Sequence, residues 1–390
     1  MSRRIEKADV RLTRARAVVL AALVLAALLI LSRREPATDY LPAERLSVET
    51  EKPQVCVHTL LENEVEEQAI LRSLELAREL GASTIVQFFP WAYVEREPGR
   101  YSWSLADRIV RHAQMQGLRV IARLGLVPDW ARDRKTKALN HLTEDLFPAF
   151  AAYAAAFAER YAGPVDHLIV WNEPNLSFEW GYQPADPARY VRLLEASYGP
   201  IKRANPQAKV LAGALAPTLE PRGSAAGLNE LDFLQEMYDL GASEFFDALA
   251  IHSYGFREPP EAEPAPDQLN FRRSELQRAI MLAAGDGHKR VYITESGWND
   301  HPRWTQAVRP SQRANYTLRA FEYVERHWDW LEHLCVWALR YPADVYSYPD
   351  NFTLVSADFA PKPIYYALQD YARGWARSET PWLPPPQADA

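Results

Sequence analysis

LIVWNEPN, at residues 168–175, joins an apolar run directly to a polar one. Four consecutive apolar residues are typical of a strand that is buried on both faces, as the strands of a parallel sheet are. The same order recurs in YITESGW at residues 292–298, where a glutamate again follows an apolar run. We therefore expect a parallel sheet whose strands end in polar residues.

From residue 55 onward, short apolar runs alternate with amphipathic helical patterns. We expect strands at 54–58, 84–89, 118–124, 166–171, 208–213, 246–251, 290–294 and 333–338. The helical patterns at 64–80, 104–116 and 144–161 are each followed by a glycine, a common end of a helix. Strict alternation predicts an α/β fold, a closed (β/α)8 TIM barrel. A doubly wound open sheet is the alternative, but it needs a Gly-rich turn after the first strand, which residues 57–60 lack.

Composition excludes two broad classes of protein. The chain has 390 residues, of which 48% are hydrophobic and 12% aromatic, so it is not a disordered protein. The net charge of −7 for the whole chain hides an uneven distribution. Residues 35–390 hold 36 basic and 49 acidic residues, a net charge of −13. A body this acidic is a poor binder of phosphates, so we expect no nucleic-acid partner.

The amino terminus carries the unbroken apolar run Ala17–Leu31. Six basic residues precede the run and two follow it, so the positive-inside rule predicts a cytoplasmic amino terminus and an exported body. A cleaved signal peptide is the alternative, but no small-x-small cleavage pattern follows residue 31. We favour an uncleaved, single-pass signal anchor in the cell membrane, and secretion after cleavage stays open.

These patterns divide the chain into five parts. We expect a basic cytoplasmic stub at 1–16, a transmembrane anchor at 17–34, a polar tether at 35–52, a barrel domain at 53–376 and a disordered Pro-rich tail at 377–390. One barrel accounts for most of the length, because (β/α)8 barrels often need 250 residues or more. We expect the protein to be a monomer.

Catalytic residues of a TIM barrel lie where the strands end, on the carboxyl side. Glu173 follows the fourth predicted strand and Glu295 follows the seventh. Two carboxylates should therefore emerge on one face of the barrel, although charges are costly in such apolar surroundings without a partner or a role. Paired carboxylates of this kind cleave glycosidic bonds.

WNEPN at 171–175 together with TESGW at 294–298 resembles clan A of the glycoside hydrolases, and within it family 39 and cellulase-like members. PGRYSW at 98–103 and PKP at 361–363 support the resemblance, which covers roughly residues 53–375. It implies that Glu173 is the general acid/base and Glu295 the nucleophile of a retaining hydrolase of β-glycosidic bonds. A carbohydrate substrate is implied, with no metal and no cofactor.

The resemblance also implies ligand contacts. Asn172 would bind the sugar hydroxyl next to the anomeric carbon, Tyr254 would hold Glu295 with His252 nearby, and Trp337 would form the floor of the pocket. The chain departs from the pattern at two strands. Many members have an arginine near the end of strand two, where this chain has Val86 followed by Gln87. On strand three the chain lacks the histidine that some relatives have and offers Arg123 instead. These departures leave the substrate open.

Trp91, Trp130 and Trp298 fall in loops expected on the carboxyl side of the barrel. Aromatic faces stack on sugars, yet they also pack loops, and both interpretations stay open for each residue.

Cys56 and Cys335 lie on strands one and eight, and we expect two buried thiols there rather than a disulfide.

Two functions compete with hydrolysis. A non-hydrolytic protein could bind a polysaccharide during its synthesis or export, and a transglycosylase would use the same residues. The sequence does not separate these alternatives.

Overall fold

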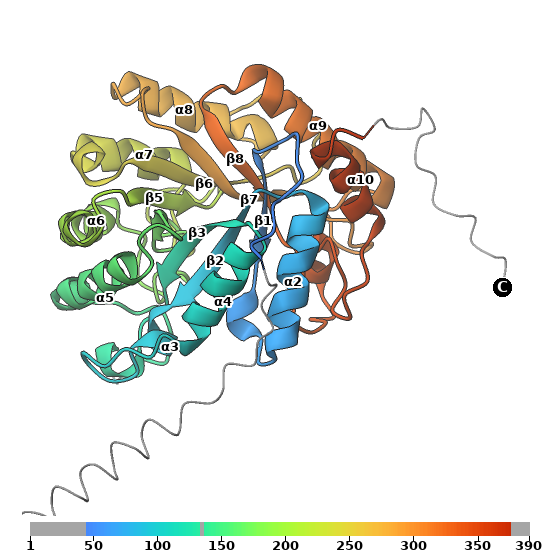
Figure 1. Ribbon diagram of the computed structural model, residues 1–390. Coiled ribbons are helices and arrows are strands. Elements are labelled where there is room, and N and C mark those ends of the chain that lie inside the picture. Colours follow the sequence, from blue (N-terminus) through green and yellow to red (C-terminus); the bar gives the residue numbers. More distant parts are fainter. Residues whose placement is uncertain (1–43, 133–135, 376–390) are drawn as a thin grey trace, which may run out of the picture. The chain divides into compact units, whose positions relative to one another are not determined.

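The structure, a computed structural model, describes residues 44–132 and 136–375 (Figure 1). The predicted stub, anchor and Pro-rich tail lie outside these residues. Within the described part of the chain, no helix combines the length and the apolar character needed to cross a membrane.

Eight parallel strands close into a barrel in the order of the sequence, with the helices around it (Figure 1). The strands are β1 Val55–Thr59, β2 Thr84–Pro90, β3 Arg119–Gly125, β4 His167–Val170, β5 Lys209–Leu215, β6 Ala248–Tyr254, β7 Val291–Gly297 and β8 Leu331–Val336. The main helices are α2 Glu67–Leu80, α4 Ser104–Met115, α5 Phe147–Arg160, α6 Pro187–Ala204, α7 Glu230–Asp239, α8 Ser274–Ala283, α9 Pro310–His327 and α10 Pro363–Ala372. The predicted (β/α)8 barrel is confirmed, and each strand lies within three residues of its predicted bounds.

Short helices interrupt the loops. They are α3 Trp91–Val94 and the 3₁₀ turns η1 Leu61–Asn63, η2 Asp129–Ala131, η3 Glu144–Leu146, η4 Ala242–Phe245, η5 Phe271–Arg273 and η6 Tyr348–Phe352. Gly81 and Gly117 lie one and two residues past the ends of α2 and α4 with positive φ angles, as predicted, whereas Gly163 lies three residues past the end of α5. Position 117 requires glycine for a second reason as well, because a Cβ there would lie 2.5 Å from the carbonyl oxygen of Leu46.

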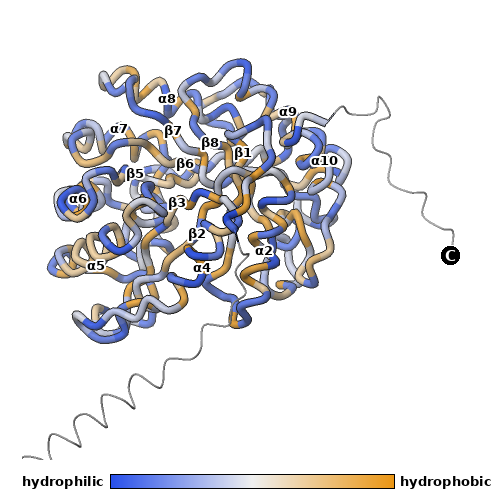
Figure 2. The backbone as a smooth tube through the Cα atoms, viewed as in Figure 1, coloured by the Kyte–Doolittle hydropathy of each residue, from blue (hydrophilic) through white to orange (hydrophobic). Residues whose placement is uncertain are grey.

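Alternation along the strands divides the core into two layers. Val55 and Val57 of β1 pack outward against the helices, whereas Cys56 between them points into the barrel. Both layers are apolar, and Figure 2 shows hydrophobic backbone along the strands at the centre of the molecule. Burial of both faces explains why the strand sequences are continuously apolar.

The described part of the predicted tether, residues 44–52, lies against the barrel. The backbone N–H of Leu46 donates to Met115 at the end of α4, and that of Glu51 donates to Ala372 at the end of α10, each at 2.8 Å. Helices end where the following strands begin, so this segment runs along the amino end of the barrel.

Cys56 and Cys335 form a disulfide between β1 and β8, so the expectation of two thiols is wrong. The physical reason is the register, which pairs these two residues directly and leaves their Cα atoms 4.1 Å apart. Both side chains point into the barrel, where they meet. The bond thus joins the first strand to the last.

Replacing both cysteines with alanine is expected to lower the free energy of unfolding by about 3–5 kcal/mol, because the bond closes a loop of 279 residues in the unfolded chain. The expected decrease in Tm is on the order of 5–15 °C by scanning calorimetry. Reductant should lower the Tm of the wild type and leave that of the double variant unchanged. Alkylation of both cysteines in denatured, non-reduced wild type would contradict the disulfide.

Candidate active site

The loop after β4 holds Glu173 in a tightly fixed backbone. Trp171 and Glu173 have φ angles of 74° and 42°, a left-handed conformation that side chains rarely adopt. The backbone N–H of Glu173 donates to Ala214 of β5 at 3.1 Å. Asn175 fixes the loop further, because its side chain exchanges hydrogen bonds with the backbone of Ala216 and donates to Leu228. The WNEPN segment therefore sets the direction of the Glu173 side chain.

Glu295 lies on β7 among hydrogen-bond donors. The Nη1 of Arg123 donates to its Oε1 at 3.0 Å, and the hydroxyl of Tyr254 donates to its Oε2 at 2.8 Å. The same Nη1 of Arg123 donates to Oδ1 of Asn172 at 2.9 Å. Arg123 thus links the residue before Glu173 to Glu295.

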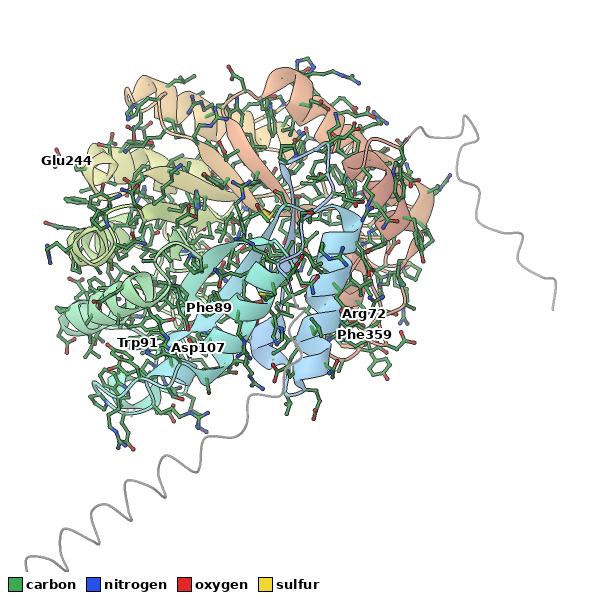
Figure 3. The ribbon with its side chains drawn as sticks, in the orientation of Figure 1. Arg72, Phe89, Trp91, Asp107, Glu244 and Phe359 are labelled. Carbon is green, nitrogen blue, oxygen red and sulfur yellow. A yellow bond between two sulfur atoms is a disulfide. The ribbon has the colours of Figure 1, made fainter. Side chains whose placement is uncertain are left out.

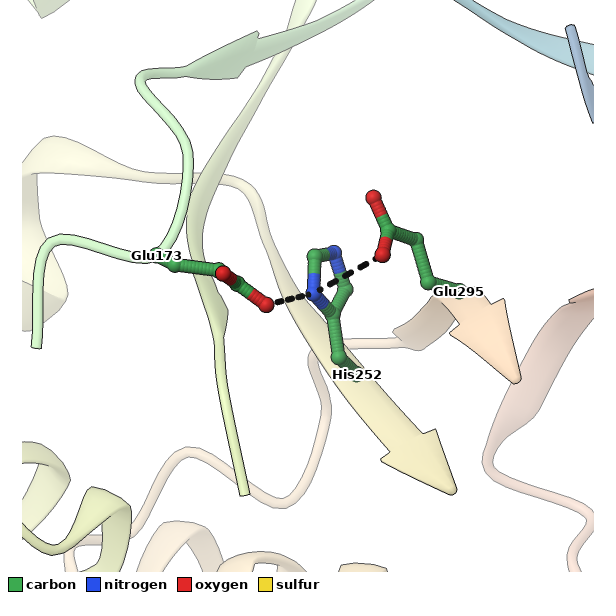
Figure 4. Close-up of side chains that lie close together, drawn as sticks. All are labelled: Glu173, His252 and Glu295. Carbon is green, nitrogen blue, oxygen red and sulfur yellow. Dashed lines mark hydrogen bonds and ion pairs between the residues drawn. The ribbon is translucent and has the colours of Figure 1, made fainter. Parts of the chain in front are cut away.

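His252 lies between the two carboxyls (Figure 4). Its Nδ1 is 2.7 Å from Oε1 of Glu173 and 3.5 Å from Oε2 of Glu295. One carboxylate oxygen of each glutamate and one histidine nitrogen lie within 4.8 Å of one another. The predicted convergence of the strand-four and strand-seven glutamates on one face of the barrel is therefore observed.

Burial changes the pKa values of Glu173, Glu295 and His252. It raises the pKa of Glu173 to about 7, and it also raises the pKa of Glu295, although there His252, Arg123 and the Tyr254 hydroxyl oppose the increase. Burial lowers the pKa of His252 to about 4, which keeps the ring neutral. The hydrogen bonds that Glu295 accepts from Arg123 and Tyr254 favour its charged form, whereas the burial of Glu173 favours its protonated form.

Trp337 lies at the end of β8, and a cis peptide bond joins it to Ala338. Its ring is half-buried and meets the ring of His58 edge-on, with 4.4 Å between the ring centroids. His58 in turn lies 3.6 Å from Oε1 of Glu295. The predicted positions of Asn172, His252, Tyr254 and Trp337 therefore place all four side chains around the two glutamates.

Gln87 does not face a ligand. Its side chain is buried, and its Oε1 accepts hydrogen bonds from the hydroxyl of Thr59 and the backbone N–H of Leu61. Its Nε2 donates to Glu62 at 2.8 Å. The predicted ligand contact is corrected: Gln87 holds the loop after β1, because all of its amide atoms bond within the protein.

Two of the three predicted tryptophans are packing residues. Trp91 (Figure 3) is 0% exposed and donates its indole N–H to Glu95 at 2.6 Å. Trp298 is 2% exposed, donates to the carbonyl of Glu258 and lies directly against Gly255. Neither ring has a face free for a sugar, so the prediction of ligand contacts is corrected for both. Trp130 is partly buried and packs edge-on against Trp91.

Sequence reasoning missed two residues of the site. His58 is fully buried beside the carboxyl of Glu295, and burial lowers its pKa well below the usual value. Glu179 lies in the loop after β4, where its carboxyl bonds the side chain of Asn172 and accepts from Asn140 at 3.3 Å. Burial and the neighbouring Glu173 raise its pKa to about 7. His58 could have been found, since it is a polar residue at the carboxyl end of a strand.

Glu173, His252 and Glu295 are also the one group among the described residues that offers three close ligand atoms for a metal ion. The guanidinium of Arg123 lies 3.0 Å from Glu295 and would repel a cation at that carboxylate. The arrangement suits proton transfer and nucleophilic attack, because burial favours the protonated form of Glu173 while two donors favour the charged form of Glu295.

No protein-family model matches the chain, and no curated protein matches it by sequence. The fold does match solved structures. A family 39 glycoside hydrolase from Bacteroides cellulosilyticus WH2 has a TM-score of 0.67 and 22% identity over 85% of this chain, and the match covers 65% of that protein. A monomeric β-xylosidase from Caulobacter crescentus CB15 has a TM-score of 0.60, 17% identity and coverages of 84% and 69%.

An exo-β-1,4-mannosidase from Opitutaceae bacterium strain TAV5 matches with a TM-score of 0.56 and 18% identity, over 86% of this chain and 62% of that protein. The chain thus spans about two thirds of the length of each of these three enzymes. At such low identity the likeness concerns the fold, and the fold of this chain is the (β/α)8 barrel of these glycoside hydrolases.

Proposed function

We propose that the protein is a retaining glycoside hydrolase that cleaves β-glycosidic bonds of an oligo- or polysaccharide. One observation carries this proposal: an oxygen of Glu173 and an oxygen of Glu295 lie within 4.8 Å of each other at the carboxyl end of the barrel. Retaining enzymes have carboxyl groups about 5–5.5 Å apart, whereas inverting enzymes need about 6.5–9.5 Å to admit a water molecule. The shorter separation supports retention of the anomeric configuration.

In this mechanism Glu295 attacks the anomeric carbon while Glu173 gives its proton to the leaving oxygen. The bond from that carbon to the leaving oxygen breaks, and a covalent glycosyl–Glu295 ester forms. Glu173, now a carboxylate, then takes a proton from a water molecule, whose oxygen replaces Glu295 at the anomeric carbon. Arg123 and Tyr254 support the first step because they keep Glu295 charged and correctly oriented.

The proposed substrate is a β-linked glycan that carries no strong negative charge. Two of the similar structures are a β-xylosidase and an exo-β-1,4-mannosidase. The body of this chain has a net charge of −13, which disfavours polyanions. Xylose, mannose, galactose and glucose are the sugars to test first.

We place the enzyme outside the cytoplasmic membrane, held by the amino-terminal anchor or secreted after cleavage. The apolar run at 17–31 and its flanking basic residues support export. The disulfide between Cys56 and Cys335 adds support, because disulfides persist in oxidising compartments and are rare in the cytosol.

The proposal is tested with the full chain and a panel of p-nitrophenyl β-glycosides, together with xylohexaose, mannohexaose and cellohexaose. We expect release of at least one sugar, with the β anomer as the first product in proton NMR spectra. The matching p-nitrophenyl α-glycosides serve as the control and should remain intact. A first product in the α form would contradict retention, and binding without release would favour the non-hydrolytic alternative.

A further inference from the structure

A hollow of about 370 Å³ lies between the loop after β4 and the loop after β5. Its size falls within the ~300–1,000 Å³ of small-molecule sites. The lining combines an aromatic ring, small apolar residues, a hydroxyl and a guanidinium, and it includes Tyr182, Pro184, Ala185, Arg222, Ser224 and Leu228. Such a mixture suits a sugar, which has apolar faces and hydroxyl edges.

The hollow is tied to Glu173 through the backbone. Asn175 follows Glu173 by two residues, so their Cα atoms are at most ~7 Å apart. The carbonyl of Asn175 accepts from the N–H of Leu228 at 2.8 Å, and the N–H of Ser177 donates to Ala226 at 2.9 Å. The loop that carries Glu173 and the loop after β5 therefore run side by side, and both line the hollow.

Tyr182 forms the exposed aromatic part of the hollow. It is 77% exposed, yet its φ angle of 59° is one that a bulky residue rarely adopts. Its backbone N–H donates to Ser177 at 2.7 Å, and the preceding Gly181 packs so closely against His141 that a Cβ would lie 2.4 Å away. The backbone at Tyr182 is thus held firmly while its ring faces solvent, as a stacking platform for sugars requires.

The position decides which part of a glycan would bind there. Glu173 protonates the leaving oxygen, so the leaving part of the chain lies on the Glu173 side, away from Glu295. The hollow is formed by the loops of β4 and its neighbour β5, whereas Glu295 belongs to β7. An occupant of the hollow is therefore on the leaving-group side of the bond that is cleaved.

We propose that this hollow binds sugar units of the leaving group, so that the protein prefers β-linked chains to single sugars with a small leaving group. This inference rests on the proposed glycosidase function. Tyr182 acts by binding the leaving portion and takes no part in the chemical steps.

The test compares Tyr182→Ala, Tyr182→Phe and Ala225→Trp in the full chain, with Tyr366→Ala on α10 as a matched change of an exposed tyrosine. Each is assayed on the p-nitrophenyl β-glycoside that the wild type cleaves and on the hexasaccharide of the same sugar. We expect Tyr182→Ala to lower the ratio of kcat/KM for hexasaccharide to that for aryl glycoside about tenfold. Ala225→Trp should lower it at least as far by filling the hollow, whereas Tyr182→Phe and Tyr366→Ala should retain it.

An unchanged ratio in both Tyr182→Ala and Ala225→Trp overturns the inference, and so does an equal loss on the two substrates, which would indicate a general effect on the fold. If the wild type cleaves neither substrate, the glycosidase proposal fails separately. Calorimetric titration with xylohexaose, mannohexaose and cellohexaose then decides the binding role. Weaker binding by Tyr182→Ala than by the wild type supports the hollow as a glycan site. Equal binding by the two proteins overturns it, and so does a wild type that binds none of the three hexasaccharides.

Discussion

Glu295→Gln is expected to lower kcat/KM by at least about 10⁴-fold, because the amide cannot form the glycosyl–enzyme bond. Binding of the uncleaved oligosaccharide should remain within a few-fold of the wild type, since glutamine keeps the size of the side chain and can still accept from Tyr254. Single-turnover kinetics measures the first effect, and calorimetric titration measures the second.

The matched control is Glu244→Gln, an exposed glutamate in η4, the short turn that precedes β6 (Figure 3). This turn lies at the amino end of the barrel, so the change should leave turnover unaltered. Turnover of Glu295→Gln at the rate of the wild type would remove Glu295 from the mechanism. Loss of both turnover and binding would indicate instead that the site had collapsed.

Glu173→Ala is expected to cost about 10²–10⁴-fold in kcat/KM on an oligosaccharide, the usual contribution of a general acid. A general acid works only while protonated, and the pKa of Glu173 is about 7. The kcat/KM of the wild type should therefore fall as the pH rises through about 7. The alanine variant is assayed on a p-nitrophenyl glycoside, whose leaving group needs little protonation. Its kcat/KM should lack this decrease at high pH, the alkaline limb of the profile. A pH series of both proteins measures the difference.

Added azide gives an independent measure, because this anion attacks the glycosyl–Glu295 ester without needing a general base. We expect azide to accelerate Glu173→Ala and to form a β-glycosyl azide. Glu179→Gln is the control, since the pKa of Glu179 is also about 7 and it could produce the same limb. An alkaline limb that persists in Glu173→Ala and disappears in Glu179→Gln would assign the limb to Glu179.

The barrel and its glutamates were predictable because both follow from simple periodicities. Strands buried on two faces are continuously apolar, and the helices between them end at glycines such as Gly81. All strands of a parallel barrel end on one side, so the polar residue after each apolar run can be placed without knowing the loops. Glu173 and Glu295 needed only this rule.

The loop residues were not predictable in the same way. An indole in a loop can pack inward or face a ligand, and the neighbouring residues determine which. Glu95 accepts the indole N–H of Trp91, and Gly255 leaves room for the ring of Trp298, so both rings pack inward. Gln87 was misplaced because the nearby Glu62 and Thr59 engage its amide. None of these partners could be identified from spacing along the chain.

Longer-range contacts were equally hidden. Cys56 and Cys335 pair only because the strand register aligns them, and the sequence gives no register. The hollow beside Tyr182 depends on hydrogen bonds between two loops that are about fifty residues apart in the chain. Glu179 approaches Glu173 because the loop between them folds back.

The disulfide between β1 and β8 can form only late in the synthesis of the chain. Cys335 follows its partner by 279 residues, so the bond cannot form until the last strand has been made. Chains that stop before residue 335 must keep Cys56 as a thiol. A thiol-reactive probe applied under denaturing conditions would therefore separate complete, oxidised chains from truncated ones in a single preparation.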